Sequence, residues 1–157
     1  MSRQHNYNIQ VKWLGNTGKG TNSYKEYKRD HQIIAEGKEP ILGSSDPSFL
    51  GDKSMYNPEE LLVASLSSCH MLWYLHLCAD NKIVVVEYDD KAIGTMIEST
   101  NGGGCFTEVT LQPRVIVTKP EMIAKAIDLH KEANALCFIA RSVNFPVKHE
   151  PEIYVSE

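Results

Sequence analysis

One stretch of the chain, from Asn57 to Cys78, constrains the fold more than any other. Its sequence, NPEELLVASLSSCHMLWYLHLC, opens with strong signals for the start of a helix. Asn57 suits the N-cap, Pro58 suits the first helical position, and Glu60 is placed to close a capping box with Asn57. We therefore predict a helix that begins at Asn57 and extends to Cys78.

Apolar side chains occupy nearly every side of this predicted helix. They are Leu61, Leu62, Val63, Leu66, Met71, Leu72, Trp73, Leu75 and Leu77. A helix that is apolar all round is enclosed either by other protein elements or by lipid. The helix also carries small or titratable polar residues, which are Ser65, Ser67, Ser68, His70 and His76. These favour a protein core, so we expect a central core helix with Cys69 in its middle and no membrane partner.

Length and charge narrow the class of protein. A chain of 157 residues suits one domain spanning 1–157, and its 16 Lys and Arg residues against 20 Asp and Glu residues leave no basic stripe for nucleic acid. The first ten residues, MSRQHNYNIQ, lack the apolar core of a signal peptide, which favours a cytoplasmic protein. Thiols in that compartment are normally reduced.

None of the four cysteines forms a CxxC pair, which argues against a zinc ribbon or a thioredoxin-like motif. They are Cys69, Cys78, Cys105 and Cys137. Two interpretations remain open, namely inert core thiols or a pair that only the fold brings together. Cys69 with His76, or Cys78 with His70, lacks a clear third metal ligand, so we expect neither a metal nor another cofactor.

The N-terminal third is predicted to form strands and a long loop. Alternating apolar residues predict a strand with one buried face over His5–Leu14, followed by a turn from Gly15. A second strand region is predicted over Ser23–Ala35. The segment Gly37–Tyr56 is rich in Gly, Pro, Ser and Asp, and we expect it to be a long loop that packs over other elements as the rim of a pocket.

Strands and a second helix are predicted after the central helix. A turn at Asp80 and Asn81 precedes three predicted strands, with a hairpin connection at 101–104 between the last two. Their expected bounds are Ile83–Tyr88, Ala92–Glu98 and Cys105–Val117. Thr118 and Glu121 predict a capping box that opens a helix with a one-sided apolar stripe, reaching Cys137 and continuing to about Ser142. A final edge strand is expected over Glu152–Val155.

These elements predict an α+β fold. One sheet face and one partly wet helix supply too little cover for a central helix that is apolar on every side. A second copy of the chain would provide the missing cover. We therefore expect an intertwined homodimer.

The segment NPEELLVASLSSCHM, together with Cys137 in LCFIARSVNF, resembles the OsmC/Ohr family of osmotically inducible and organic-hydroperoxide-resistance proteins. The spacing of 68 residues between Cys69 and Cys137 is similar to that of the family's two cysteines. The resemblance implies an OsmC-like α+β fold in which two long central helices lie against curved antiparallel sheets in a homodimer.

The resemblance also implies an activity, the thiol-dependent reduction of organic hydroperoxides. Cys69 would be the peroxidatic thiolate and Cys137 would resolve its sulfenic acid as a disulfide. An external dithiol, for which the family suggests a dihydrolipoyl protein, would then reduce this disulfide. The family's arginine and glutamate would correspond to Arg29 and Glu59. Such an enzyme is an antioxidant peroxidase that acts under oxidative stress.

Elementary chemistry indicates what this site needs. The thiolate is the nucleophile, and a thiol several turns from a helix N-terminus requires a cation from elsewhere, a role that Arg29 suits. Glu59 precedes Cys69 by ten residues, or roughly 15 Å along a helix, which is too far for one guanidinium to bridge. We expect Glu59, together with Arg29, to serve the cysteine of the partner chain.

Each assignment has a structural alternative. Glu59 would then stabilise only the helix dipole, and Arg29 would be a solvated strand charge. Phe138 follows Cys137, where the family commonly has proline. The alternative function is therefore an OsmC-like protein that binds a small molecule or senses redox state through its thiols without turnover.

Overall fold

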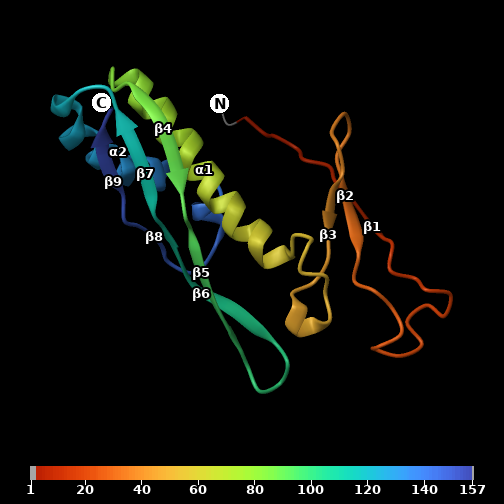
Figure 1. Cartoon of the computed structure of the whole chain (residues 1–157). Coiled ribbons are helices and arrows are strands. Elements are labelled where there is room, and N and C mark those ends of the chain that lie inside the picture. Colours follow the sequence, from red (N-terminus) through yellow and green to blue (C-terminus); the bar gives the residue numbers. More distant parts are fainter. Residues whose placement is uncertain (1–2, 157) are drawn as a thin grey trace. The chain divides into compact units, whose positions relative to one another are not determined.

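The computed structural model describes residues 3–156 and forms two compact units, with the boundary between Leu61 and Leu62 (Figure 1). The first unit contains a three-stranded antiparallel sheet in the order β1-β2-β3. Its elements are β1 (Gln10–Trp13), β2 (His31–Ile34), β3 (Ile41–Gly43) and the short 3-10 helix η1 (Pro47–Phe49).

The strands of the first unit are shorter than their sequence patterns predicted. Pairing of β1 with β2 begins at Gln10 and Ile34, so the preceding residues of the predicted strand have no neighbouring strand to bond. The expected buried face of this strand was wrong, because Val11 and Trp13 are exposed. Only the end of Ser23–Ala35 is a strand, and the predicted loop Gly37–Tyr56 contains β3 and η1.

The turn predicted from Gly15 is confirmed. Gly18 and Gly20 have φ angles of 106° and 57°, which belong to the left-handed region that favours glycine. The side-chain oxygen of Asn16 accepts hydrogen bonds from the backbone N–H groups of both glycines, at 2.9 and 3.0 Å. Local turn chemistry, and not phosphate binding, therefore explains this glycine-rich segment.

Helix α1 (Pro58–Asp80) is the predicted central helix, and its capping box is confirmed. The Asn57 side-chain oxygen accepts the N–H of Glu60 at 2.7 Å, and the Glu60 carboxylate accepts the N–H of Asn57 at 3.1 Å. By length and apolar composition α1 would suffice to cross a bilayer. One face is nevertheless buried within the protein, while Leu72 on another face is 64% exposed.

The second unit contains two three-stranded sheets, ordered β4-β7-β9 and β5-β6-β8. Their strands are β4 (Val85–Asp90), β5 (Ile93–Glu98), β6 (Gly104–Leu111), β7 (Pro113–Val117), β8 (Val147–His149) and β9 (Glu152–Val155). The predicted edge strand Glu152–Val155 is confirmed as β9. The expectation of antiparallel sheets holds for β4 with β7 and β5 with β6, but β6 pairs with β8, and β7 with β9, in parallel.

The single strand predicted over Cys105–Val117 is two strands, separated at Gln112. The carboxylate of Asp90 accepts the N–H of Gln112 at 2.7 Å, and Pro113 has no N–H to continue the ladder. The same carboxylate accepts a hydrogen bond from the Ser67 hydroxyl of α1 at 2.5 Å. The break between β6 and β7 is therefore fastened to the central helix.

The second helix begins later and ends earlier than predicted. The 3-10 helix η2 (Pro120–Met122) precedes α2 (Ile123–Leu136), and a separate 3-10 turn, η3, covers Ala140–Ser142. The predicted capping box was wrong, because the Thr118 hydroxyl donates to the Met122 sulfur at 3.6 Å. Cys137 has extended backbone angles and terminates α2.

Both helices pack on the sheet that contains β7. One core cluster joins Tyr74, Leu77 and Cys78 of α1 to Ala126, Leu129 and Ala133 of α2 and to Val115 and Val117 of β7. A second cluster joins Leu66 of α1 to Val109 and Leu111 of β6. The α+β class expected from the sequence is confirmed.

Two buried histidines, His70 of α1 and His130 of α2, form a cluster with the partly buried His149 of β8. His70 and His130 are 1% and 0% exposed, and their Nε2 and Nδ1 atoms lie 2.9 Å apart in a hydrogen bond. His149 of β8 stacks on both rings. Burial, followed by the nearby imidazoles, lowers the pKa of His70 to about 4 and the pKa of His130 to about 3.

The buried histidines predict that the fold is acid-labile. Because the pKa of each ring is lower when folded than the ordinary value of 6.5, falling pH favours the unfolded chain. The contribution of each ring is complete above about pH 6.5 and is lost toward pH 4, by up to about 1.4 kcal/mol per pH unit. Urea unfolding at a series of pH values, followed by circular dichroism, measures this slope.

The substitution H70Q is expected to reduce the slope, because an amide does not titrate in this range. H76Q is the matched control, since His76 is exposed on the same helix in an ion pair with Asp80. An H70Q slope equal to that of the wild type would contradict the assignment to His70.

Candidate functional site

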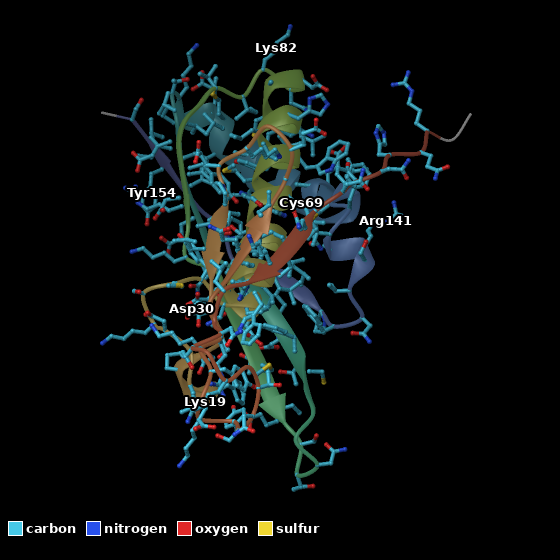
Figure 2. The ribbon with its side chains drawn as sticks, turned by 90° about the vertical axis from the view of Figure 1, so that its right-hand side faces the viewer. Lys19, Asp30, Cys69, Lys82, Arg141 and Tyr154 are labelled. Atoms are coloured by element: carbon cyan, nitrogen blue, oxygen red, sulfur yellow. The ribbon has the colours of Figure 1, made fainter. Side chains whose placement is uncertain are left out.

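The structure places Cys69 about halfway along α1, as Figure 2 shows. Its side chain is partly exposed, and its sulfur is a free thiol. Cys137, also a free thiol, lies where α2 ends, and its backbone N–H bonds to the carbonyl of Ala133 at 2.9 Å. The end of one helix thus faces the middle of the other.

The thiols of Cys69 and Cys137 are neighbours in the structure. Burial, followed by the neighbouring thiol of Cys69, raises the pKa of Cys137 to about 11. The N–H of Ala140 donates to the Cys137 sulfur at 3.4 Å and partly opposes that rise. Cys137, at 0% exposure, therefore stays a neutral thiol near pH 7, and Cys69 is the more accessible sulfur.

Aromatic side chains flank both cysteines. Trp73 follows Cys69 by one helical turn, and Phe138 follows Cys137 directly. Their rings meet edge to face with centroids 5.8 Å apart, and Phe138 is 67% exposed. Each cysteine therefore has an aromatic residue close to it in the chain, and the exposed Phe138 ring is available to an apolar molecule.

Arg29 lies in the first unit and is held in place there. Its guanidinium carbon is 4.3 Å from the ring centroid of Tyr24 and 4.2 Å from that of Tyr27. The same guanidinium donates to the backbone carbonyls of these two tyrosines, at 2.6 and 2.5 Å. Arg29 is therefore a fixed, partly buried cation and not the freely solvated strand charge of the alternative interpretation.

Glu59 lies in the first turn of α1, where its charge favours the helix dipole. Glu60, not Glu59, makes the capping bonds to Asn57. The ion pairs formed by residues 3–156 are Lys19–Glu26, His76–Asp80, Arg114–Glu87 and Lys148–Glu108. None of these ion pairs joins Arg29 to Glu59. Of the four predicted site residues, the structure places the two cysteines near each other. The roles of Arg29 and Glu59 stay predictions.

The other two cysteines are Cys78 and Cys105. Cys78 is buried in the core, and Cys105 is exposed on β6. Within residues 3–156, no group of three or more His, Cys, Asp or Glu side chains is arranged to hold a metal ion.

The sequence patterns did not predict that His130 is the partner of His70. The signal was available, because His130 lies on the apolar stripe of α2 between Ala126 and Ala133. A polar residue on a stripe that is otherwise buried needs a polar partner. The partner's identity depends on how the two helices pack, which the stripe alone does not reveal.

The family model for OsmC-like proteins matches residues 51–152, which include Glu59, Cys69 and Cys137. No curated protein sequence matches the chain significantly. Among solved structures, an OsmC-like protein of unknown function from Vibrio cholerae is 30% identical, with a TM-score of 0.85 over 95% of this chain and 100% of that chain.

Two further structures share the fold at lower identity. An organic hydroperoxide resistance protein from Elizabethkingia anophelis is 18% identical, with a TM-score of 0.69 over 99% of this chain and 100% of that one. An organic hydroperoxide resistance protein of Bacillus subtilis is 15% identical, with a TM-score of 0.60 over 95% and 98%. The family match and the Vibrio cholerae relative together establish that this chain belongs to the OsmC-like family.

Proposed function

We propose that the protein is a thiol-dependent peroxidase that reduces organic hydroperoxides. The observation that carries the proposal is the pairing of a partly exposed Cys69 with a buried, neutral Cys137 across two helices. Two inert core thiols would have no need to meet. A nucleophile and a resolving thiol must meet, because the second attacks the oxidised form of the first.

The proposed reaction has three balanced steps. The Cys69 thiolate attacks the O–O bond of ROOH, and with one proton gives Cys69–SOH and the alcohol ROH. The Cys137 thiol then attacks the sulfenic acid, which forms the Cys69–Cys137 disulfide and releases water. An external dithiol, for which a dihydrolipoyl protein is our proposal, reduces the disulfide and is itself oxidised.

Organic hydroperoxides suit this site because of its aromatic neighbours. Trp73 and the exposed Phe138 offer apolar surface to the R group of ROOH, which hydrogen peroxide lacks. The names of two structural relatives, organic hydroperoxide resistance proteins, are in keeping with this choice of substrate. We propose that the protein acts in the cytoplasm against oxidative stress.

Activation of Cys69 requires a cation, and Arg29 is the proposed source. Its guanidinium uses two donors on backbone carbonyls in the first unit, which leaves further N–H groups for a sulfur and a carboxylate. Glu59 is the proposed carboxylate that orients it. Because Glu59 and Cys69 lie ten residues apart on one helix, we propose that Arg29 and Glu59 act on the cysteine of the partner chain.

A homodimer is proposed for a second reason, the composition of the first unit's surface. In the described part of that unit, the buried residues are Gly15, Gly43, Ser44 and Asn57, none with a large apolar side chain. Large apolar side chains are instead exposed at Tyr7, Ile9, Val11, Ile41, Leu42 and Leu50, among others. Such a surface is typical of an interface, and a second copy would cover it.

One observation favours the alternative function of a redox sensor or small-molecule binder. Because Cys137 is fully buried, a bulky dithiol would reach the Cys69–Cys137 disulfide only through Cys69. A slowly reduced disulfide suits a sensor better than a turnover enzyme. Steady-state turnover separates the two.

Turnover is tested with cumene hydroperoxide and dihydrolipoamide. We expect the wild type to consume peroxide continuously and C69S to fall to the uncatalysed rate, because Ser lacks a comparable nucleophile. C137S should stop after one equivalent and hold a sulfenic acid that dimedone traps. Mass spectrometry of the wild type after one equivalent should locate the Cys69–Cys137 bond. A wild type no faster than C69S would refute the peroxidase and leave the sensor.

The role of Arg29 is tested by alkylation of Cys69 with iodoacetamide. If the guanidinium favours the thiolate, R29A should slow alkylation about tenfold at pH 7, and much less at pH 10, where the thiolate forms without help. K28A is the matched control, since Lys28 is the exposed neighbouring cation. Equal slowing of R29A at both pH values would indicate a steric effect instead.

The homodimer is tested by sedimentation equilibrium. A chain of 17.6 kDa should sediment at twice that mass at the concentrations used for turnover. Replacing exposed apolar side chains of β1 and the residue before it, as in I9E/V11E, should favour the monomer, because two buried carboxylates would be unpaired at the interface. A wild type that sediments as a monomer would contradict the dimer and the cross-chain role of Glu59.

A further inference from the structure

We propose that the buried His70–His130 pair is a positioning element, which fixes helix α1 against helix α2 so that the sulfurs of Cys69 and Cys137 meet. The inference rests on the proposed thiol chemistry but not on peroxide as the oxidant. Neither histidine touches the reacting atoms, so each would act through the helix that carries a cysteine.

The position of the pair in the chain is the first argument. His70 directly follows Cys69 on α1, and His130 precedes Cys137 by seven residues, or two turns of α2. Their ring nitrogens are joined at 2.9 Å in the core. This bond therefore ties the two helices close to the point where each presents its sulfur.

Packing fixes the orientation of both rings. Tyr74 of α1 stacks on His130, with centroids 3.8 Å apart and planes 13° apart. His149 of β8 stacks at 5.7 Å from His70 and 6.2 Å from His130. Rings held on both sides have one rotamer available, so the bond between them defines a single register of α1 on α2.

The energetic cost of the cluster is the second argument. His70 Nδ1, His130 Nε2 and His149 Nδ1 are buried without a hydrogen-bond partner. Apolar residues of similar volume would avoid the cost of these unpaired atoms. Leucines would also let α1 slide along α2, because apolar contacts are not directional. The histidine pair therefore lowers the stability of the fold and fixes the position of α1 relative to α2.

That position matters because a disulfide tolerates little error. Two cysteines can be joined only when their Cα atoms lie within about 4.4–6.8 Å, so a slip of one helix by a few ångströms separates them. The effective concentration of one thiol at the other measures how well the two helices hold the cysteines together. It is measured by exchange with a reference thiol, without any peroxide.

The test uses the redox equilibrium of the protein with reduced and oxidised glutathione at pH 7, approached from both sides and quenched for mass spectrometry. H130L removes the bond but keeps apolar volume, and we expect it to lower the effective concentration at least tenfold. The double variant H70Q/H130N places amide groups at the positions of Nε2 and Nδ1. It should stay within about threefold of the wild type, which a merely structural role of the imidazoles would not predict.

The matched control is V109A, which removes buried volume from the other core cluster. V109A should lower stability and leave the effective concentration unchanged. The inference is overturned if H130L keeps the wild-type value, or if V109A lowers it as much as H130L does. Lack of peroxidase turnover would not affect this result, since glutathione exchange involves only the thiols.

A pH series on the wild type needs no substitution and remains available if H130L does not fold. Protonation of the rings puts charge into the core, so the effective concentration should fall from pH 7 to pH 4 in the wild type and fall less in H70Q/H130N, where His149 is the remaining imidazole of the cluster. The other titratable groups that face the cluster are Tyr74 and Cys78 of α1, Tyr88 of β4 and Lys131 of α2. None of these has an ordinary pKa between 4 and 7. An unchanged wild-type value over this range would contradict the inference.

Discussion

The second unit depends on how α1 is held against α2. The His70–His130 hydrogen bond spans the two helices, and the thiols of Cys69 and Cys137 are neighbours across them. The surrounding core is apolar, so these contacts have few competitors and their geometry is retained. The sheet carrying β7 supports both helices, and the Asp90 carboxylate fastens α1 to the break between β6 and β7. The polar contacts that position Cys69 are therefore made by side chains of α1 itself.

The asymmetry of the two cysteines follows from their places on the helices. Cys69 lies in mid-helix at a partly exposed position, while Cys137 ends its helix in the core. Burial raises the pKa of Cys137, so near neutral pH it holds its proton and can donate it to the neighbouring sulfur. A thiol of this kind is a poor first nucleophile and a well-placed second one. The proposed division of roles between the two cysteines therefore agrees with their different burial as well as with the sequence motif.

Local signals in the sequence were sufficient for some elements and not for others. The capping box at Asn57 and Glu60 formed as predicted, because both partners lie within one turn. The similar pattern at Thr118 failed, since the Met122 sulfur took the hydroxyl. The strand over Cys105–Val117 was divided by Asp90, more than ten residues away. The meeting of Cys69 and Cys137 followed from family resemblance, whereas His130 and His149 depended on tertiary packing that no local pattern encodes.

The first unit carries a fixed cation and almost no apolar interior. Arg29 is held between two tyrosine rings by bonds that require no carboxylate, so its orientation is set before any partner arrives. The sheet beside it exposes the apolar side chains that a core would bury. An apolar surface of this kind is typical of an interface, and the proposed second copy would cover it. In the proposed dimer, the surface that gains cover belongs to the unit that carries Arg29, so assembly would deliver the proposed activating cation at the same time.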